Sequence, residues 1–295
     1  MLYSFAKRLL AALLAVFCFF SNLGSGSQRW TFEAPESAIS VTYADKAHCT
    51  LKLFMNEGAK SANVLFLIHG GSWMGGTESE YYADCLEAVK LGYCAATIDY
   101  SKLNDGATVA DMVDEIDLAV KAVKTEMENR GTVPKSMVMA GHSAGAHLML
   151  LYAYSRYKTC PIPIAFTVSN AGPTEFLTDA KAKTTMMGKS AYLLLSAMTK
   201  EVVLPSTIER NKAAIDSVSP LSMVTKDVPP TIVVHGDADT IVPFQNGVDL
   251  YNALQGCGVD TEMIVYKGGS HFLSSKDDAA KCAEVFFAFA EKYCK

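Results

Sequence analysis

The sequence predicts a three-layer α/β sandwich, in which helices cover both faces of a mostly parallel β-sheet. Two observations carry this prediction. Short apolar runs, typical of strands buried on both faces, alternate along the chain with longer segments of helical periodicity. In addition, the 295 residues, of which 50% are hydrophobic and 19% charged, are enough to bury one large core. We therefore expect βαβ units within one domain.

The first 26 residues differ in character from the rest. Lys7 and Arg8 precede an unbroken apolar run over residues 9–20, and the small polar stretch SNLGSGS follows it. This order predicts a secretory signal peptide over residues 1–26. The apolar run is shorter than the roughly 20 residues of a membrane-spanning helix, so we expect no membrane anchor after cleavage. Residues 27–295 are expected to be secreted or extracytoplasmic, as a single domain.

Strands and helices alternate along the expected domain. The stretches AISVTYAD and CTLKLFMN alternate apolar and polar residues, which predicts a half-buried antiparallel pair. Buried strands are predicted at NVLFLIHGG, YCAATIDY, SMVMAG, IAFTVSNAG, PTIVVHGD and TEMIVYKGGSH. Helices are predicted at YYADCLEAVKLG, residues 107–130, AHLMLLYAYS, GVDLYNALQGCG and DDAAKCAEVFFAFAEKYC. Residues 173–220 contain TTMMGKSAYLLLSAM and no clear strand, which indicates a short helical, cap-like insertion.

The composition argues against some classes of partner and site. The formal net charge is −5, or −7 without the two basic residues of the signal segment, and no basic run is present. We therefore expect no nucleic-acid partner. No C-x-x-C or histidine-rich spacing indicates a metal site. Export permits disulfides, so we expect one to three of them, together with buried thiols, among Cys49, Cys85, Cys94, Cys160, Cys257, Cys282 and Cys294.

One stretch carries a candidate nucleophile. In MAGHSAGAHLML, Ser143 stands between Gly141 and Gly145, after the predicted strand SMVMAG and before a predicted helix. A strand-turn-helix elbow of this kind lifts a serine to the carboxyl edge of the sheet, and small flanking residues let strand and helix cross closely. Open α/β sheets hold their sites at that edge. The partial positive charge at the helix N-terminus also favours an oxyanion there.

A serine hydroxyl needs a base to take its proton, and the base needs an acid to orient it. Among six histidines, chain order and a glycine-rich loop favour His271 as the base. Asp239, in the loop after PTIVVHGD, is favoured as the acid, and Asp237 as a turn-forming residue. The other histidines have structural interpretations: hydrogen bonds that stiffen loops for His69, His142 and His235, a buried or partly buried helix position for His147, and the early strand pair for His48.

The glycine-rich loop HGGSWMGG, after NVLFLI, is the fourth part of the candidate site. Its glycines let backbone N–H groups approach a substrate carbonyl, and the N–H of Ala144 supplies a complementary donor. Neither G-x-x-x-x-G-K-[ST] nor G-x-G-x-x-G is present, which argues against a nucleotide site. Four such parts, in the order loop, serine, aspartate and histidine, predict nucleophilic catalysis by Ser143.

With these motifs identified, the sequence resembles the α/β-hydrolase superfamily, in its esterase and lipase branch related to hormone-sensitive lipase. HGGSW, GHSAG, HGDADTIVP and GGSH carry the resemblance, which covers about residues 60–293. AGPTEF and SPLSMV also look like the small secreted carboxylesterases that include acetylxylan and feruloyl esterases. The resemblance implies an α/β-hydrolase sandwich without a cofactor. It implies these roles: Ser143 as nucleophile, Asp239 as acid, His271 as base, and Gly70, Gly71 and Ala144 as oxyanion-hole contributors.

The sequence departs from the pattern of this branch at two places. Ser72 stands where the branch usually has a third loop glycine, and no arginine follows the Asp-Tyr pair in IDYSKLNDG. The first departure affects which N–H groups of the loop point into the oxyanion hole. The second affects the assignment of the sequence to a subfamily of this branch.

The expected function is hydrolysis of short-chain carboxylic esters through an acyl-enzyme, on a small-molecule or polysaccharide-linked substrate. Acetyl or feruloyl esters on plant polysaccharide are a candidate substrate by analogy with the similar enzymes. One alternative is a serine peptidase or amidase on the same fold, although such peptidases usually add a large domain for which the chain has no room. Another is a non-catalytic hydrolase-fold binding protein, against which the complete set of motifs argues.

Substrate contacts are predicted at three positions, each with a packing alternative. Trp73, beside the oxyanion loop, either stacks on a sugar or an aromatic acyl group or packs in the core. Met186 and Met187 belong to the cap-like insertion. This insertion either walls the acyl or alcohol pocket or only packs its helices together.

Overall fold

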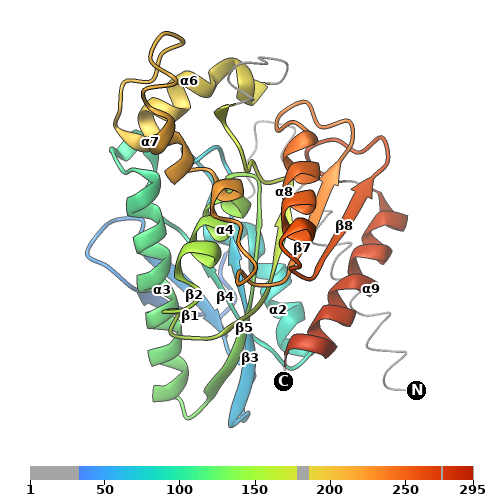
Figure 1. Cartoon of the computed structure of the whole chain (residues 1–295). Coiled ribbons are helices and arrows are strands. Elements are labelled where there is room, and N and C mark those ends of the chain that lie inside the picture. The colour runs from blue at the N-terminus through green and yellow to red at the C-terminus, as the bar shows by residue number, and fades with distance from the viewer. Residues whose placement is uncertain (1–32, 178–185, 274, 295) are drawn as a thin grey trace.

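In the computed structural model of the chain, eight strands of the described residues form one sheet with helices on both of its faces (Figure 1). The structure describes residues 33–177, 186–273 and 275–294, so the predicted signal peptide lies outside the described residues. The strands are β1 (Ile39–Thr42), β2 (Thr50–Phe54), β3 (Ser61–Ile68), β4 (Cys94–Ile98), β5 (Val133–His142), β6 (Ile164–Asn170), β7 (Thr231–Gly236) and β8 (Thr261–Tyr266).

The order of the strands across the sheet is β1-β2-β4-β3-β5-β6-β7-β8. β2 is antiparallel to both of its neighbours, β1 and β4, and every other pair is parallel. This arrangement confirms the predicted mostly parallel sheet and the antiparallel pair at its start. It also brings the loops after β3, β5, β7 and β8 to one edge of the sheet, because the carboxyl ends of parallel strands lie together.

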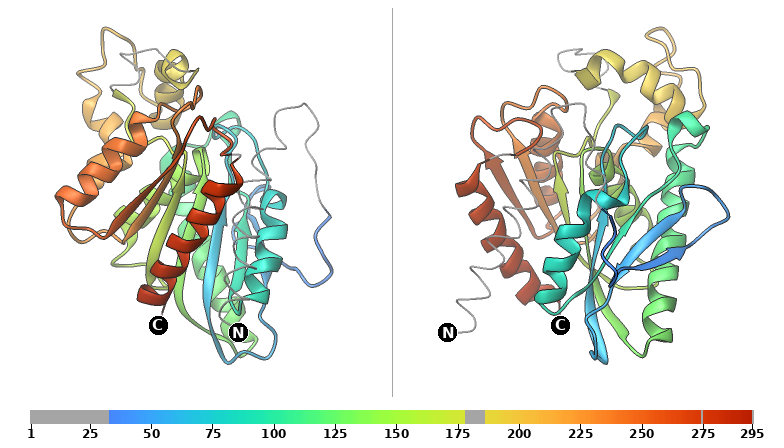
Figure 2. Two further views of the ribbon diagram at one scale, coloured as in Figure 1. Left: turned by 90° about the vertical axis from the view of Figure 1, so that its right-hand side faces the viewer. Right: turned by 180° about the vertical axis from the view of Figure 1, so that it is seen from behind.

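Helices cover the two faces of the sheet (Figure 2). The α-helices of the described residues are α2 (Tyr82–Lys90), α3 (Val109–Asn129), α4 (Ala144–Arg156), α6 (Met186–Thr199), α7 (Lys212–Ser217), α8 (Gln245–Gly256) and α9 (Lys276–Tyr293). This part of the chain also forms the short 3₁₀ helices η2 (Glu78–Tyr81), η3 (Leu103–Asp105) and η4 (Pro220–Met223). α3, α4 and α8 pack on one face, and α2 and α9 on the other. Within the described residues, no helix combines the length and the apolar character needed to cross a membrane.

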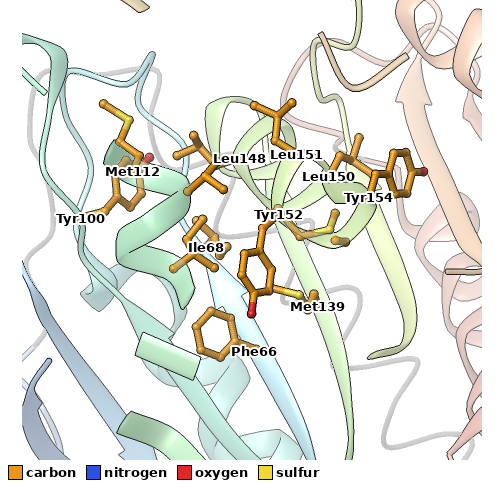
Figure 3. Close-up of a cluster of buried hydrophobic side chains, with 14 of the residues drawn as sticks. Phe66, Ile68, Tyr100, Met112, Met139, Leu148, Leu150, Leu151, Tyr152 and Tyr154 are labelled. Carbon is orange, nitrogen blue, oxygen red and sulfur yellow. The ribbon is translucent and has the colours of Figure 1, made fainter. Parts of the chain in front are cut away.

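Alternating side chains of the central strands divide the hydrophobic core between these two faces. On β3, Phe66 and Ile68 point toward α3 and α4, whereas Leu67 between them belongs to the cluster under α2 and α9. Figure 3 shows part of the first cluster, where these two residues and Met139 of β5 lie beside Tyr152 of α4. Both faces of the central strands are thus buried, which explains their continuous apolar runs.

The long predicted helix is α3, and local signals explain its ends. Thr108 Oγ1 accepts a hydrogen bond from the N–H of Asp111 at 3.1 Å, and the N–H of Thr108 donates to the Asp111 carboxylate at 2.7 Å. These two bonds satisfy backbone groups that the first helical turn leaves free. Gly131, whose φ is 79°, follows the last residue of the helix and its cap.

The region of the predicted insertion contains α6 and α7, and these helices stand on the side of the sheet where β7 and β8 end (Figure 1). Ala191, Leu195 and Met198 of α6 are buried in the cluster that contains α3 and α4. Residues 178–185 lie outside the described part of the chain. The described part of the insertion is therefore helical and packs onto the main core.

The predicted disulfides are wrong for the described part of the chain, in which no disulfide joins any of the seven cysteines. Four of them are buried: Cys49, Cys85, Cys94 and Cys282. Cys94 and Cys85 illustrate the reason, since they pack in the hydrophobic clusters on opposite faces of the sheet. A buried thiol behaves as a small hydrophobic side chain and needs no partner sulfur.

The carboxyl group of Asp84 on α2 is the basis of a stability prediction. The residue is 2% exposed, and neither carboxyl oxygen hydrogen-bonds another described residue. Burial raises the pKa of Asp84 well above its ordinary value. An unpaired buried polar group is costly, so Asp84→Ala should raise the free energy of unfolding by about 1–2 kcal/mol. Urea unfolding at pH 7 measures this gain.

Two comparisons test the cause of this gain. Asp84→Asn leaves an unpaired polar group in the same place and should stabilise less than the alanine variant. The advantage of Asp84→Ala should also shrink toward pH 4, because protonating the carboxyl to match the folded state then costs less free energy. A loss of stability in Asp84→Ala would contradict the prediction.

Candidate active site

Ser143 lies in a sharp turn between β5 and α4. Its φ of 55° and ψ of −123° form a backbone conformation that is strained for any residue other than glycine. A Cβ on Gly141 would lie 2.6 Å from the carbonyl carbon of Gly145, and one on Gly145 would lie 2.1 Å from the carbonyl oxygen of Ile68. Neither position accepts a larger residue. The N–H of Ser143 donates to the carbonyl of Asn170 at 2.9 Å, which holds the turn against β6.

Asp239 and His271, the predicted acid and base, are joined in the structure. His271 Nδ1–H donates to Asp239 Oδ2 at 2.7 Å, between the loops after β7 and β8. The other carboxylate oxygen accepts N–H groups from residues 241 and 242 at 2.8 and 3.0 Å. Burial alone would raise the pKa of Asp239, but the hydrogen bonds from His235 and His271 outweigh it and hold this pKa below its ordinary value. Asp237 is exposed and accepts an N–H from the loop after β8 at 2.6 Å, as suits a turn residue.

Two further histidines support this pair. His235 Nε2 lies 3.2 Å from the same Oδ2 of Asp239, so this oxygen has two imidazole neighbours. His142 Nε2–H donates to the main-chain carbonyl of His271 at 2.9 Å, and the two rings lie 4.7 Å apart. Burial, and then the nearby His271, lower the pKa of His142 to about 3, so it is neutral at physiological pH. Because His142 directly precedes Ser143, this bond ties the serine turn to the loop of His271.

The oxyanion loop predicted after β3 lies beside this turn. A Cβ on Gly70 would lie 3.3 Å from the Cβ of Ser143, so loop and serine are neighbours. Gly71 has a φ of 112°, and a Cβ there would meet the loop's own backbone at 2.3 Å. Among the described residues, the N–H groups of Gly70, Gly71 and Ala144 have no hydrogen-bond acceptor. Ser72, at the position of the usual third glycine, adopts a φ of 56°.

The environment of Trp73 favours packing over substrate contact. The side chain is buried, with 3% exposure, and its indole N–H donates to His147 Nδ1 at 3.0 Å. The rings of His147 and Phe176 pack against it. Met186 and Met187 begin α6, but their side chains lie outside the described part of the structure.

A buried polar cluster beneath the oxyanion loop was not foreseen from the sequence. Lys102 Nζ lies 2.5 Å from Asp99 Oδ1, and His69 Nε2 lies 3.1 Å from both of these groups. His69 Nδ1–H donates to the carbonyl of Gly70, and the Tyr100 hydroxyl donates to the carbonyl of His69 at 2.8 Å. One sequence signal could have indicated this cluster: the arginine usual after Asp-Tyr in this branch is absent. Lys102, two residues after Tyr100, supplies a cation in this region instead. His69 and the lysine thus anchor the start of the loop.

No group of three histidine, cysteine, aspartate or glutamate side chains in the described ranges is arranged to hold a metal ion. The side chains at this edge of the sheet instead provide a hydrogen-bonded carboxylate and imidazole, a serine on a strained turn, and backbone donors. This combination suits activation of a hydroxyl and stabilisation of an oxyanion.

The buried His147 generates a prediction for acid stability. Burial lowers its pKa to about 4, whereas an unfolded histidine titrates near its ordinary value of 6.5. Between these values the unfolded state binds more protons than the folded state. The contribution of His147 to the free energy of unfolding is therefore fully present above about pH 6.5 and falls by about 3 kcal/mol as the pH approaches 4. Urea unfolding between pH 7.5 and 4.5 measures the loss.

His147→Gln, which does not titrate, provides the control for that experiment. It should be less stable than the wild type at pH 7.5 but should lose less further stability on acidification. Parallel pH dependence in the two proteins would show that His147 is not the group responsible.

Comparison with known proteins places the chain in a family. The BD-FAE family model matches residues 51–254. Esterase LipQ of Mycobacterium tuberculosis is 28% identical over 207 residues, which are 68% of this chain and 48% of LipQ. Isoprenylcysteine alpha-carbonyl methylesterase ICME of Arabidopsis thaliana is 24% identical over 283 residues, 90% of this chain and 64% of ICME. The chain thus spans about half to two thirds of the length of these relatives.

A solved structure agrees with the fold. A truncated form of a carbohydrate esterase from gut microbiota superposes with a TM-score of 0.72 at 17% identity, and the match covers 90% of this chain and all of that one. The family match covers most of the sheet and the serine turn, so the chain belongs to the BD-FAE family, an esterase family of the α/β-hydrolase superfamily.

Proposed function

We propose that this protein is a serine carboxylesterase in which Ser143 is the nucleophile, His271 the general base and Asp239 the orienting acid. The observation that carries the proposal is the 2.7 Å hydrogen bond between His271 and Asp239 at the edge of the sheet where Ser143 occupies its strained turn. The esterase names of relatives such as LipQ support the same class of reaction.

The proposed reaction proceeds through an acyl-enzyme. His271 Nε2 takes the proton of the Ser143 hydroxyl as its oxygen attacks the ester carbonyl carbon, and the tetrahedral oxyanion accepts N–H donors from Gly70 or Gly71 and from Ala144. The imidazolium then protonates the leaving alcohol. The same imidazole then deprotonates a water molecule, which attacks the carbonyl carbon of the acyl-serine. The carboxylic acid is released, and the imidazolium returns the proton to the Ser143 oxygen. Asp239 keeps the Nδ1–H tautomer of His271 throughout.

The first test is an assay on nitrophenyl esters from acetate to decanoate, with the wild type and Ser143→Ala side by side. We expect the wild type to hydrolyse the short esters and the variant to lose at least about 10³-fold in kcat, because the acyl-enzyme cannot form. Circular dichroism and thermal unfolding should show that the variant is folded. A folded Ser143→Ala protein with near wild-type rates would overturn the assignment.

The same assay addresses the substrate class. We propose short-chain acyl groups, because the cap-like insertion is too short for the broad lid of an enzyme that acts on long-chain fats. Acetyl or feruloyl esters on polysaccharide are the proposed natural class, supported by the carbohydrate esterase whose fold this chain shares. Activity on peptide anilides without activity on esters would instead favour the serine peptidase or amidase.

We also propose that the protein is exported and that residues 1–26 are removed. The basic start and the apolar run over residues 9–20 support this proposal. Expression of the full sequence in a secreting host should yield extracellular protein whose intact mass corresponds to a new N-terminus near residue 27. Retention of the full mass inside the cell would contradict export.

A further inference from the structure

The oxyanion loop has a strained backbone conformation that depends on contacts with the rest of the protein. Gly71, Ser72 and Trp73 have φ values of 112°, 56° and 58°, so three successive residues are left-handed. Left-handed backbone conformations are unfavourable for residues other than glycine, and two of these three residues, Ser72 and Trp73, are not glycine. Such a backbone persists only when surrounding contacts hold it.

Two contacts hold the end of this segment at Trp73. The N–H of Leu103 donates to the carbonyl of Trp73 at 2.9 Å. On the side chain, the indole N–H donates to His147 Nδ1 at 3.0 Å. The indole and the imidazole meet edge to face with ring centres 5.1 Å apart, and both side chains are buried.

His147 can accept this bond in only one protonation state. Its Nε2 lies 2.7 Å from the carbonyl of Val218, an acceptor, so Nε2 carries the hydrogen. Nδ1 is then unprotonated and free to accept from Trp73. Burial keeps the ring neutral, and a proton on Nδ1 would place two donors face to face. The bond therefore fixes the tautomer as well as the orientation of the ring.

The position of His147 relates this contact to the proposed chemistry. His147 lies on α4 one turn after Ser143, and its N–H donates to the Ser143 carbonyl at 3.1 Å. The same first turn carries the N–H of Ala144. The Trp73 bond thus connects the helix that presents one oxyanion donor to the loop that presents the other.

We propose that Trp73 and His147 are positioning residues, which set the separation between the loop donors and the Ala144 donor of the oxyanion hole. The catalytic consequence rests on the proposed function, whereas the contact itself does not. An oxyanion develops only in the transition state, so a displaced donor lowers kcat more than it changes KM. This role replaces the predicted contact of Trp73 with substrate.

Trp73→Phe tests the proposal, because phenylalanine preserves an aromatic ring and removes only the N–H donor and part of the ring area. We expect kcat on nitrophenyl acetate to fall about 10-fold or more, with KM within twofold of wild type. Tyr154→Phe is the matched control. It also removes one buried hydrogen bond made by α4, the 2.9 Å bond to Thr231 Oγ1, but Tyr154 faces away from the loop toward β7. Its kcat should stay within twofold.

Two substitutions of near-equal size, His147→Asn and His147→Leu, separate positioning from simple packing. The asparagine side chain retains an amide oxygen near the position of Nδ1, whereas leucine offers no acceptor. We expect the asparagine variant to keep a several-fold higher kcat than the leucine variant. Equal kcat in the two variants, or a wild-type kcat in Trp73→Phe, would overturn the proposal, and a rise in KM alone would show substrate contact instead.

A spectroscopic measurement reads the contact without relying on activity. The full sequence contains two tryptophans, Trp30 and Trp73, so indole ¹H–¹⁵N spectra are simple, and Trp73→Phe assigns the signal. The Trp73 indole proton should exchange slowly with solvent, and its resonance should move more in His147→Leu than in His147→Asn. If no ester is hydrolysed but these shifts occur, the contact stands and the proposed function fails. An unchanged signal in His147→Leu would refute the contact itself.

Discussion

The close crossing of β3, β5 and α4 is the constraint on which the rest of the site depends. Glycine at positions 141 and 145 allows the backbones to meet, since a Cβ at Gly145 would lie 2.1 Å from the carbonyl oxygen of Ile68. This approach forces the chain to reverse within one residue, and Ser143 takes the strained conformation. It also brings the N-terminus of α4 beside the loop that leaves β3. The strain at Ser143 and the closeness of the backbone donors therefore have one geometric cause.

Hydrogen bonds among buried polar groups hold the loops around this crossing. The carboxylate of Asp239 receives two backbone N–H groups on one oxygen and faces two imidazoles on the other, so it remains ionised although it is buried. His142 holds the carbonyl of His271. Buried polar groups of this kind are favourable only when their hydrogen bonds are satisfied, and satisfied networks are rigid. The loops after β5, β7 and β8 are thereby held in one arrangement.

Local signals explain which parts of the molecule could be predicted from the sequence. The period of α3 and the apolar runs of β3 and β5 reflect burial patterns that depend on each element alone. The bond between Asp239 and His271 was foreseeable because strand ends of a parallel sheet converge at one edge. The contact of Trp73 with His147, 74 residues apart, has no such local signature. The same applies to Lys102, whose burial beside Asp99 depends on how the loop after β4 folds back.

The histidines show why residue type alone does not assign a role. His142, His147, His235 and His271 all lie close to Ser143 in the sequence or in the fold, yet their surroundings separate them. Burial lowers the pKa of His142 to about 3 and that of His147 to about 4, so near neutral pH both rings are uncharged. Each then has one donor and one acceptor nitrogen to orient its neighbours. His271 differs because its Nδ1 is committed to a carboxylate, an arrangement that stabilises the positive charge the ring gains when its other nitrogen takes a proton. Burial thus gives some of these imidazoles a structural role, and the placement of a single aspartate suits another one to the proposed role of base.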